Sequence, residues 1–144
     1  MPDRETELKT FICFDYGKKR IGVATGQSLT RTASELETIK AVENKPDWQS
    51  ISRIIQQWQP GALVLGLPLN DDGTEHQMTK AVRKFSNQLK ERYRLPVYFI
   101  DERLSSREAE QQIDNKRAIM RDKGLVDKMA ARILLQDWLD QNVG

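Results

Sequence analysis

Two short apolar segments on either side of a tight turn set what the chain can fold into. These residues run Phe11-Ile-Cys-Phe-Asp-Tyr-Gly-Lys-Lys-Arg-Ile-Gly-Val-Ala-Thr25. Short runs rich in β-branched and aromatic residues, divided by a glycine turn, predict a β-hairpin. Asp15 lies where the first strand leaves the core, and a carboxylate there is costly unless it is paired or binds a cation. The hairpin therefore predicts a sheet edge at which an acidic side chain needs a partner.

Apolar periodicity along the rest of the chain predicts an α/β fold. The expected strands are residues 10–16, 20–26, 33–39, 62–66 and 97–100, and the expected helices are 48–58, 78–95, 106–115 and 126–140. Short connections favour an antiparallel meander for the first three strands, and right-handed crossovers add the fourth and fifth in parallel to the first. We therefore expect a five-stranded mixed sheet in the order 3-2-1-4-5, flanked by helices. Residues 1–144 are expected to form one domain, with residues 1–9 as a flexible N-terminal arm.

Net charge and the distribution of apolar residues limit the class of protein to which the chain can belong. The net charge of +2 permits nucleic acid as a partner without indicating it. The N-terminus lacks the apolar segment of a secretory signal, and no apolar run approaches the roughly 20 residues of a membrane span. We therefore expect a cytoplasmic protein that does not contact a membrane. Cys13, the only cysteine, is expected in the core, as are the tryptophans of the helix patterns, Trp48, Trp58 and Trp138.

Acidic residues follow two of the predicted strands at the same edge of the sheet. Asp15 ends the first strand, and the pair Asp101-Glu102 ends the fifth, two strand positions away. At about 4.8 Å per strand, their backbones lie roughly 10 Å apart, and side chains reaching inward can close that gap around a metal. Open α/β sheets place their ligand sites at this edge.

A third acid comes from the last predicted helix. At about 100° per residue, Asp127 lies within about 40° of Ala131, Leu134 and Trp138, so it heads an apolar stripe that faces the sheet. Three inward carboxylates from separate elements suit two divalent cations, because Mg²⁺ takes oxygen ligands and a metal pair clamps a phosphodiester.

Each acid also has a simpler interpretation. Asp15 suits the start of a turn, and Asp127 suits the positive end of a helix dipole. Glu102 suits a surface ion pair with Arg103 or Arg107. The metal interpretation depends on the convergence of the three acids on one edge.

Four segments, in this order, resemble the signatures of the YqgF/RuvX family. They are Asp15-Tyr-Gly-Lys-Lys-Arg-Ile-Gly22, Gly66-Leu-Pro-Leu-Asn70 with Asp72-Gly-Thr-Glu75, Asp101-Glu-Arg-Leu-Ser105, and Asp127-Lys-Met-Ala-Ala131. The resemblance extends from Phe11 to about Leu139. It implies a ribonuclease-H-like fold and a nuclease of the Holliday junction resolvase superfamily. In bacteria, it also implies a role in maturing the 5′ end of small-subunit ribosomal RNA.

The resemblance assigns roles to individual residues. Asp15, Glu102 and Asp127 match the catalytic acids, which would hold Mg²⁺ or Mn²⁺. The sequence Gly-Leu-Pro at the end of the fourth strand offers no carboxylate, so the second acid comes from the fifth strand, as Asp101 or Glu102. His76 stands where the family has glycine, and we expect no catalytic role for it.

The predicted reaction is metal-dependent hydrolysis of a phosphodiester by an activated water, without a covalent protein intermediate. Candidate contacts to the nucleic acid are cationic, namely Lys18, Lys19, Arg20, Arg103, Arg107, Lys116 and Arg117. The loop at residues 70–75 would suit a substrate-contacting lid.

The expected substrate is the ribosomal RNA precursor, and the alternative is a four-way DNA junction, on which two coordinated cuts would favour a homodimer. A nucleic-acid-binding module without catalysis is the alternative of another class. An actin-like phosphotransferase has a similar phosphate-binding hairpin but needs two such domains, which 144 residues do not supply.

Overall fold

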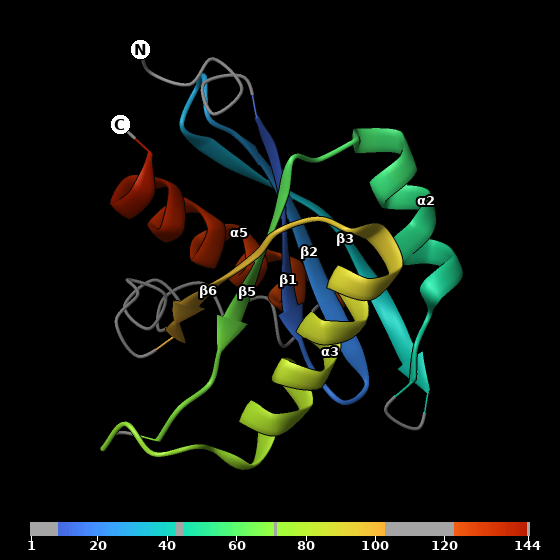
Figure 1. The fold of residues 1–144 in the computed structure, drawn as a ribbon, viewed down its shortest axis with the longest axis vertical. Helices are drawn as coiled ribbons and strands as arrows, with labels where there is room; N and C mark the ends of the chain where they lie inside the picture. The colour runs from blue at the N-terminus through green and yellow to red at the C-terminus, as the bar shows by residue number, and fades with distance from the viewer. Residues whose placement is uncertain (1–8, 43–44, 71, 103–122, 144) are drawn as a thin grey trace.

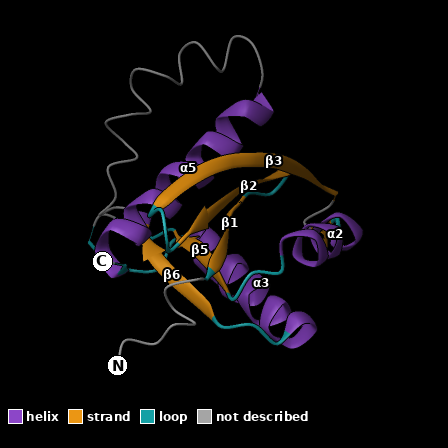
Figure 2. Cartoon of the chain, turned by 90° about the horizontal axis from the view of Figure 1, so that it is seen from above, coloured by secondary structure: helices purple, strands orange, loops and turns teal. Residues whose placement is uncertain are grey.

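A mixed β-sheet with helices on both faces organises the molecule (Figure 1). The computed structural model describes residues 9–42, 45–70, 72–102 and 123–143. Viewed from above, helix α5 (Lys123–Asn142) covers one face of the sheet, and helices α2 (Trp48–Trp58) and α3 (Gln77–Tyr93) lie on the other (Figure 2). None of the described helices combines the length and apolar character that crossing a membrane requires.

The sheet has the predicted order with one addition. Its strands are β1 (Thr10–Tyr16), β2 (Arg20–Gln27), β3 (Thr32–Val42), β4 (Lys45–Pro46), β5 (Ala62–Leu67) and β6 (Val97–Asp101). They lie in the order β4-β3-β2-β1-β5-β6, with β1 antiparallel to β2 and parallel to β5, and β6 parallel to β5. The expected order 3-2-1-4-5 is therefore confirmed. The prediction of five strands missed β4, because two residues have no readable period and a proline belongs only at a sheet edge.

Local signals explain where the helices begin and end. The Asp47 carboxylate accepts hydrogen bonds from the backbone N–H and the hydroxyl of Ser50, which cap α2 and lower the pKa of Asp47. Gln59, in the left-handed conformation at φ 45°, ends α2 just before Pro60. The last helix begins three residues before the expected start at residue 126. The helix expected at 106–115 lies outside the described residues.

Alternation along the strands divides the core into two layers. On β1, Ile12 and Phe14 pack with α2 and α3, while Phe11 and Cys13 pack with α5. The α5 face of the sheet also contains glycines: a Cβ on Gly26 would lie 2.9 Å from a methyl group of Leu135 in α5. This absence of side chains lets α5 lie close against the strands, and it brings the N-terminal part of α5 to the edge where Asp15 is found.

Candidate active site

The first acid is placed by the alternation of β1. Phe11 and Cys13 point toward α5 and are buried, so Asp15, two residues further on, belongs to the same face. Asp15 is half-buried at the end of the strand, and it pairs across the antiparallel ladder with Gly22 of β2. The carboxylate therefore lies on the α5 side of the sheet, where apolar packing gives way to solvent.

The second acid is Glu102, the residue directly after β6, and it is placed by the alternation of that strand. Tyr98 stacks on Trp138 of α5, and Ile100 is buried in the α5 layer, so Glu102 follows them on that face. A Cβ on Gly66 of β5 would lie 2.5 Å from Oε1 of Glu102. Glycine at the end of β5 thus leaves the space that the Glu102 carboxylate takes. The carboxylate beside the end of β5 is thus supplied by Glu102, from the end of the neighbouring strand β6.

The third acid is held in position by the hairpin. Nε of Arg20 donates a hydrogen bond to Oδ2 of Asp127 at 2.6 Å, in an ion pair whose side chains are 37% and 26% exposed. The backbone of Asp127 also lies directly on the hairpin, because a Cβ on Gly22 would overlap its carbonyl oxygen. The apolar stripe predicted to accompany Asp127 is buried against the sheet, as Ala131, Leu134 and Trp138 show.

The three acids line one pocket of about 280 Å³, together with Arg20 and His76. The structure thus brings Asp15, Glu102 and Asp127 together from three elements that are far apart in the sequence. Asp101 is not among the lining residues. In the part of the chain that the structure describes, no three acidic, histidine or cysteine side chains form a group spaced to hold a metal ion. Asp127 is instead paired with Arg20.

His76 lies in the pocket for a structural reason that the sequence did not reveal. The imidazole Nδ1 of His76 accepts a hydrogen bond from the backbone N–H of Met78 at 3.0 Å. The backbone N–H of His76 donates to the Thr79 hydroxyl at 2.7 Å. The Thr79 hydroxyl in turn donates to the carbonyl of Pro68, which ties the first turn of α3 to the segment after β5. His76 is therefore the N-cap of α3, a position usually taken by Ser, Thr, Asp or Asn, so no standard signal marked it.

Tyr16 borders the same pocket from the other face of the sheet. Burial raises the pKa of its hydroxyl above the ordinary value of 10.0, so the side chain is a neutral phenol at neutral pH. A neutral phenol adds no negative charge beside the three carboxylates.

The candidate cationic contacts divide into two groups. Lys18 and Lys19 are exposed at the tip of the hairpin, next to the pocket, and Arg20 lines it. The remaining predicted contacts, Arg103, Arg107, Lys116 and Arg117, lie outside the described residues.

The described residues of the polar loop after β5 are linked to one another by hydrogen bonds. Oδ1 of Asp72 accepts hydrogen bonds from the backbone N–H and the hydroxyl of Thr74, and Nδ2 of Asn70 donates to the carbonyl of Glu75. A bridge between Leu69 and Glu75 closes the loop at its base.

Relatives of known description match nearly the whole chain. A protein of Haemophilus ducreyi described as "Putative pre-16S rRNA nuclease" is 44% identical over 136 residues, 92% of this chain and 97% of the relative. A Yersinia pestis protein of the same description is 45% identical over 139 residues, 94% of this chain and 98% of the relative.

Solved structures with little sequence similarity share the fold. RuvC of T. thermophilus, solved with a Holliday junction substrate, aligns with a TM-score of 0.55 at 15% identity, over 92% of this chain and 94% of that one. The Fowlpox virus resolvase, solved with Holliday junction DNA, aligns with a TM-score of 0.56 at 15% identity, over 94% and 99%. The fold is thus ribonuclease-H-like, as the resemblance implied. Residues 9–141 match the family described as "RuvX: Holliday junction resolvase", and the chain belongs to this RuvX (YqgF) family.

Proposed function

We propose that this chain is a divalent-metal-dependent nuclease that cleaves phosphodiester bonds in the precursor of small-subunit ribosomal RNA. The observation that carries the proposal is the convergence of Asp15, Glu102 and Asp127 on one pocket at the carboxyl edge of the sheet. Relatives at 44% and 45% identity, described as pre-16S rRNA nucleases, favour this substrate.

The ligand chemistry of the pocket, rather than its present spacing, favours Mg²⁺ or Mn²⁺. The three acids offer carboxylate oxygens, which are the ligands that these hard cations prefer. Asp15, Glu102 and Asp127 would hold the metal. When bound, divalent cations supply Lewis acidity to a phosphodiester and lower the pKa of a bound water.

Arg20 links the metal ligands to the substrate phosphate. In the structure its guanidinium neutralises Asp127 through Nε. A guanidinium has five N–H donors, so the groups that do not face Asp127 can bind a phosphate oxygen at the same time. Arg20 therefore orients the Asp127 carboxylate and offers a phosphate contact beside it.

Cleavage of four-way DNA junctions is the second candidate function. The family description and the fold shared with two resolvases favour it. Because a junction needs two coordinated cuts, this function would favour a homodimer. A binding module without catalysis is less well supported, since such a module has no use for three carboxylates in one pocket that would repel a phosphate.

A cleavage assay tests the proposal. Precursor ribosomal RNA and a four-way DNA junction are incubated side by side with the protein, in Mg²⁺, in Mn²⁺ and in EDTA. We expect cleavage of the RNA in either metal and none in EDTA. Cleavage of the junction alone would replace the proposed substrate by the second candidate. Cleavage that persists in EDTA would contradict the metal mechanism, and no cleavage of either substrate would contradict nuclease function.

Removal of the Arg20 cation is expected to tighten metal binding. In Arg20→Gln, the Asp127 carboxylate loses the positive charge at 2.6 Å that competes with a metal ion. Because both side chains are partly exposed, the pair is worth no more than about 1 kcal/mol, so the Kd for Mn²⁺ should fall by about two- to fivefold. Calorimetric titration with Mn²⁺ measures this change.

The matched control is Arg53→Gln, which removes an ion pair of 2.8 Å with Glu37 away from the pocket. The control should leave the Kd for Mn²⁺ unchanged. Weaker Mn²⁺ binding in Arg20→Gln would show instead that Arg20 is needed to hold Asp127 in a metal-binding position.

A further inference from the structure

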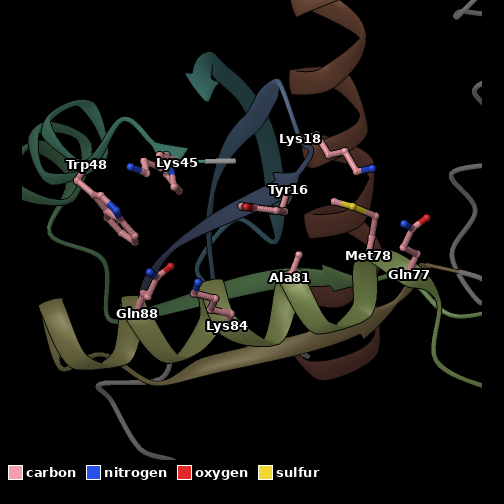
Figure 3. Close-up of a pocket in the computed structure, with 10 residues that line it drawn as sticks. Tyr16, Lys18, Lys45, Trp48, Gln77, Met78, Ala81, Lys84 and Gln88 are labelled. Carbon is pink, nitrogen blue, oxygen red and sulfur yellow. The ribbon is translucent and has the colours of Figure 1, made fainter. Parts of the chain in front are cut away.

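A second hollow of about 690 Å³, larger than the pocket of the three acids, lies on the other face of the sheet. One wall is a single face of α3, formed by residues spaced four, three and four apart: Gln77, Ala81, Lys84 and Gln88. The opposite wall comes from the β1–β2 hairpin, β4 and the start of α2. Figure 3 shows these side chains along α3, with Trp48 and Lys45 at one end and Met78 and Lys18 at the other. We call this hollow the lysine–aromatic groove.

The charge of the groove has one sign. Lys18 on the hairpin, Lys45 on β4 and Lys84 on α3 each line it from a different element. No acidic side chain is among the described residues that form its walls. Lysines on three sides of an elongated hollow are suited to successive phosphates of one strand, because they act as point charges without demanding a fixed geometry.

The aromatic side chains of the groove are held in place from behind. The ring of Trp48 lies 5.6 Å from that of Phe85 and carries the guanidinium carbon of Arg92 at 4.0 Å from its centroid. The ring of Tyr16 lies 4.9 Å from the same Phe85. Two fixed, uncharged rings beside three lysines are the combination on which unpaired bases stack.

The groove adjoins the candidate active site. Tyr16 and Met78 line both hollows, so a strand bound in one would lie next to the other. A duplex does not suit this site, because its bases are stacked on one another and are not available to Trp48 and Tyr16.

We propose that the lysine–aromatic groove binds a single-stranded segment of the nucleic-acid substrate that continues from the phosphodiester in the pocket of the three acids. The inference rests on the proposed nuclease function in one respect: that function places the other end of the strand in the pocket of the three acids. Its phosphates bind Lys18, Lys45 and Lys84, and its bases lie against Trp48 and Tyr16. The groove thereby selects substrates with an unpaired segment next to the cleavage site.

Binding without cleavage tests the groove separately from the nuclease function. A fluorescein-labelled single-stranded RNA of about 12 nucleotides is titrated with the full chain in EDTA, and anisotropy is followed at several salt concentrations. In the triple variant Lys18→Gln/Lys45→Gln/Lys84→Gln we expect binding weaker by about tenfold or more. The slope of log K against log salt should fall by about 2, at about 0.7 per lost phosphate contact.

The control removes the same charge elsewhere. Lys40, Lys80 and Lys90 are exposed lysines of the described chain that do not line the groove. The triple variant Lys40→Gln/Lys80→Gln/Lys90→Gln should bind the single strand within about twofold of the wild type. If both triple variants lose affinity equally, binding depends on overall charge and the groove assignment is wrong, whatever the cleavage assay shows.

One variant and two further ligands test whether bases lie against the aromatic side chains of the groove. The single strand should change the tryptophan emission of the wild type, and Trp48→Phe should lose that change. A strand of the same length without bases should bind more weakly by about tenfold, since stacking is worth about 1–3 kcal/mol per base. A blunt RNA duplex should compete poorly. Equal binding of the baseless strand, equal competition by the duplex, or an unchanged emission would each overturn the assignment of this groove to unpaired bases.

Discussion

We expect Asp15→Asn to reduce the cleavage rate by at least about a thousandfold while the protein stays folded. Asparagine has nearly the same shape as aspartate and keeps one carbonyl oxygen, so packing at the end of β1 changes little. In the proposed mechanism the lost negative charge would help to hold a divalent cation against a phosphodiester. Such an effect is worth several kcal/mol, and each 1.36 kcal/mol is a factor of ten in rate. Single-turnover cleavage of the RNA precursor in saturating Mg²⁺ measures the loss, and thermal unfolding checks the fold.

The neighbouring acids provide the matched comparison. Glu102→Gln removes a carboxylate that lines the pocket, and it should reduce the rate by a similar order. Asp101→Asn changes the adjacent residue, which pairs with Leu67 at the end of the sheet and does not line the pocket. We expect Asp101→Asn to cleave within about threefold of the wild type. If the Asp101 variant is inactive and the Glu102 variant active, the second acid is Asp101. An Asp15→Asn protein that cleaves normally would rule out the mechanism altogether.

The strands and their order could be predicted because burial leaves a period in the sequence. The run of residues 62–66 is apolar at nearly every position, as a strand covered on both faces requires, and it lies in β5 between β1 and β6. The alternation of Tyr98 and Ile100 would also have favoured Glu102 over Asp101, since residues two apart share a face. Predicting that Glu102 fills the space above Gly66 needed the neighbouring strand in place, because the contact joins two elements separated by α3.

Other features of the site depend on contacts that no local pattern encodes. Arg20 and Asp127 are 107 positions apart, and their ion pair exists only because α5 lies on the hairpin. Trp48 fits a helix period and was expected in the core. The structure leaves it half-buried on the wall of the lysine–aromatic groove, because β4 and the hairpin leave a hollow beside it. The expectation for Trp138, which is 8% exposed beneath Tyr98, is confirmed.

Glycines on the α5 face of the sheet therefore indicate where the acids of the candidate site are placed. A glycine in a strand interior weakens the strand, so its presence indicates that something lies close above it. Gly66 makes room for the Glu102 carboxylate, and Gly22 makes room for the backbone of Asp127. Two of the three acids are thus positioned by the absence of a side chain on a neighbouring strand.

Gly22→Ala is expected to damage both stability and cleavage. Alanine should favour a strand by roughly 0.5–1 kcal/mol over glycine, but its Cβ would overlap the Asp127 carbonyl oxygen, and a backbone atom cannot rotate away. Relief requires the start of α5 to move from the hairpin, at a cost of about 3 kcal/mol in the free energy of unfolding. The same movement displaces the Asp127 carboxylate, and a shift of about 1 Å at a catalytic group can cost about a hundredfold in rate. Urea unfolding and single-turnover cleavage measure the two effects.

Gly26→Ala separates this contact from the general effect of adding a methyl group under α5. Gly26 lies on the same strand and face, but its Cβ would meet side-chain methyl groups of Leu135 and Leu139 at 2.9 and 3.0 Å, which can adjust by rotation. Its nearest backbone atom, the carbonyl oxygen of Thr32, would be 3.2 Å away. We therefore expect Gly26→Ala to cost about 1 kcal/mol and to keep its cleavage rate, because the contact lies far along α5 from Asp127. If the two alanine variants lose stability and activity to the same extent, the close approach of Asp127 to Gly22 does not position the acid. A larger loss of cleavage in Gly22→Ala than its loss of stability explains would show that the hairpin holds Asp127 in the geometry that the reaction needs.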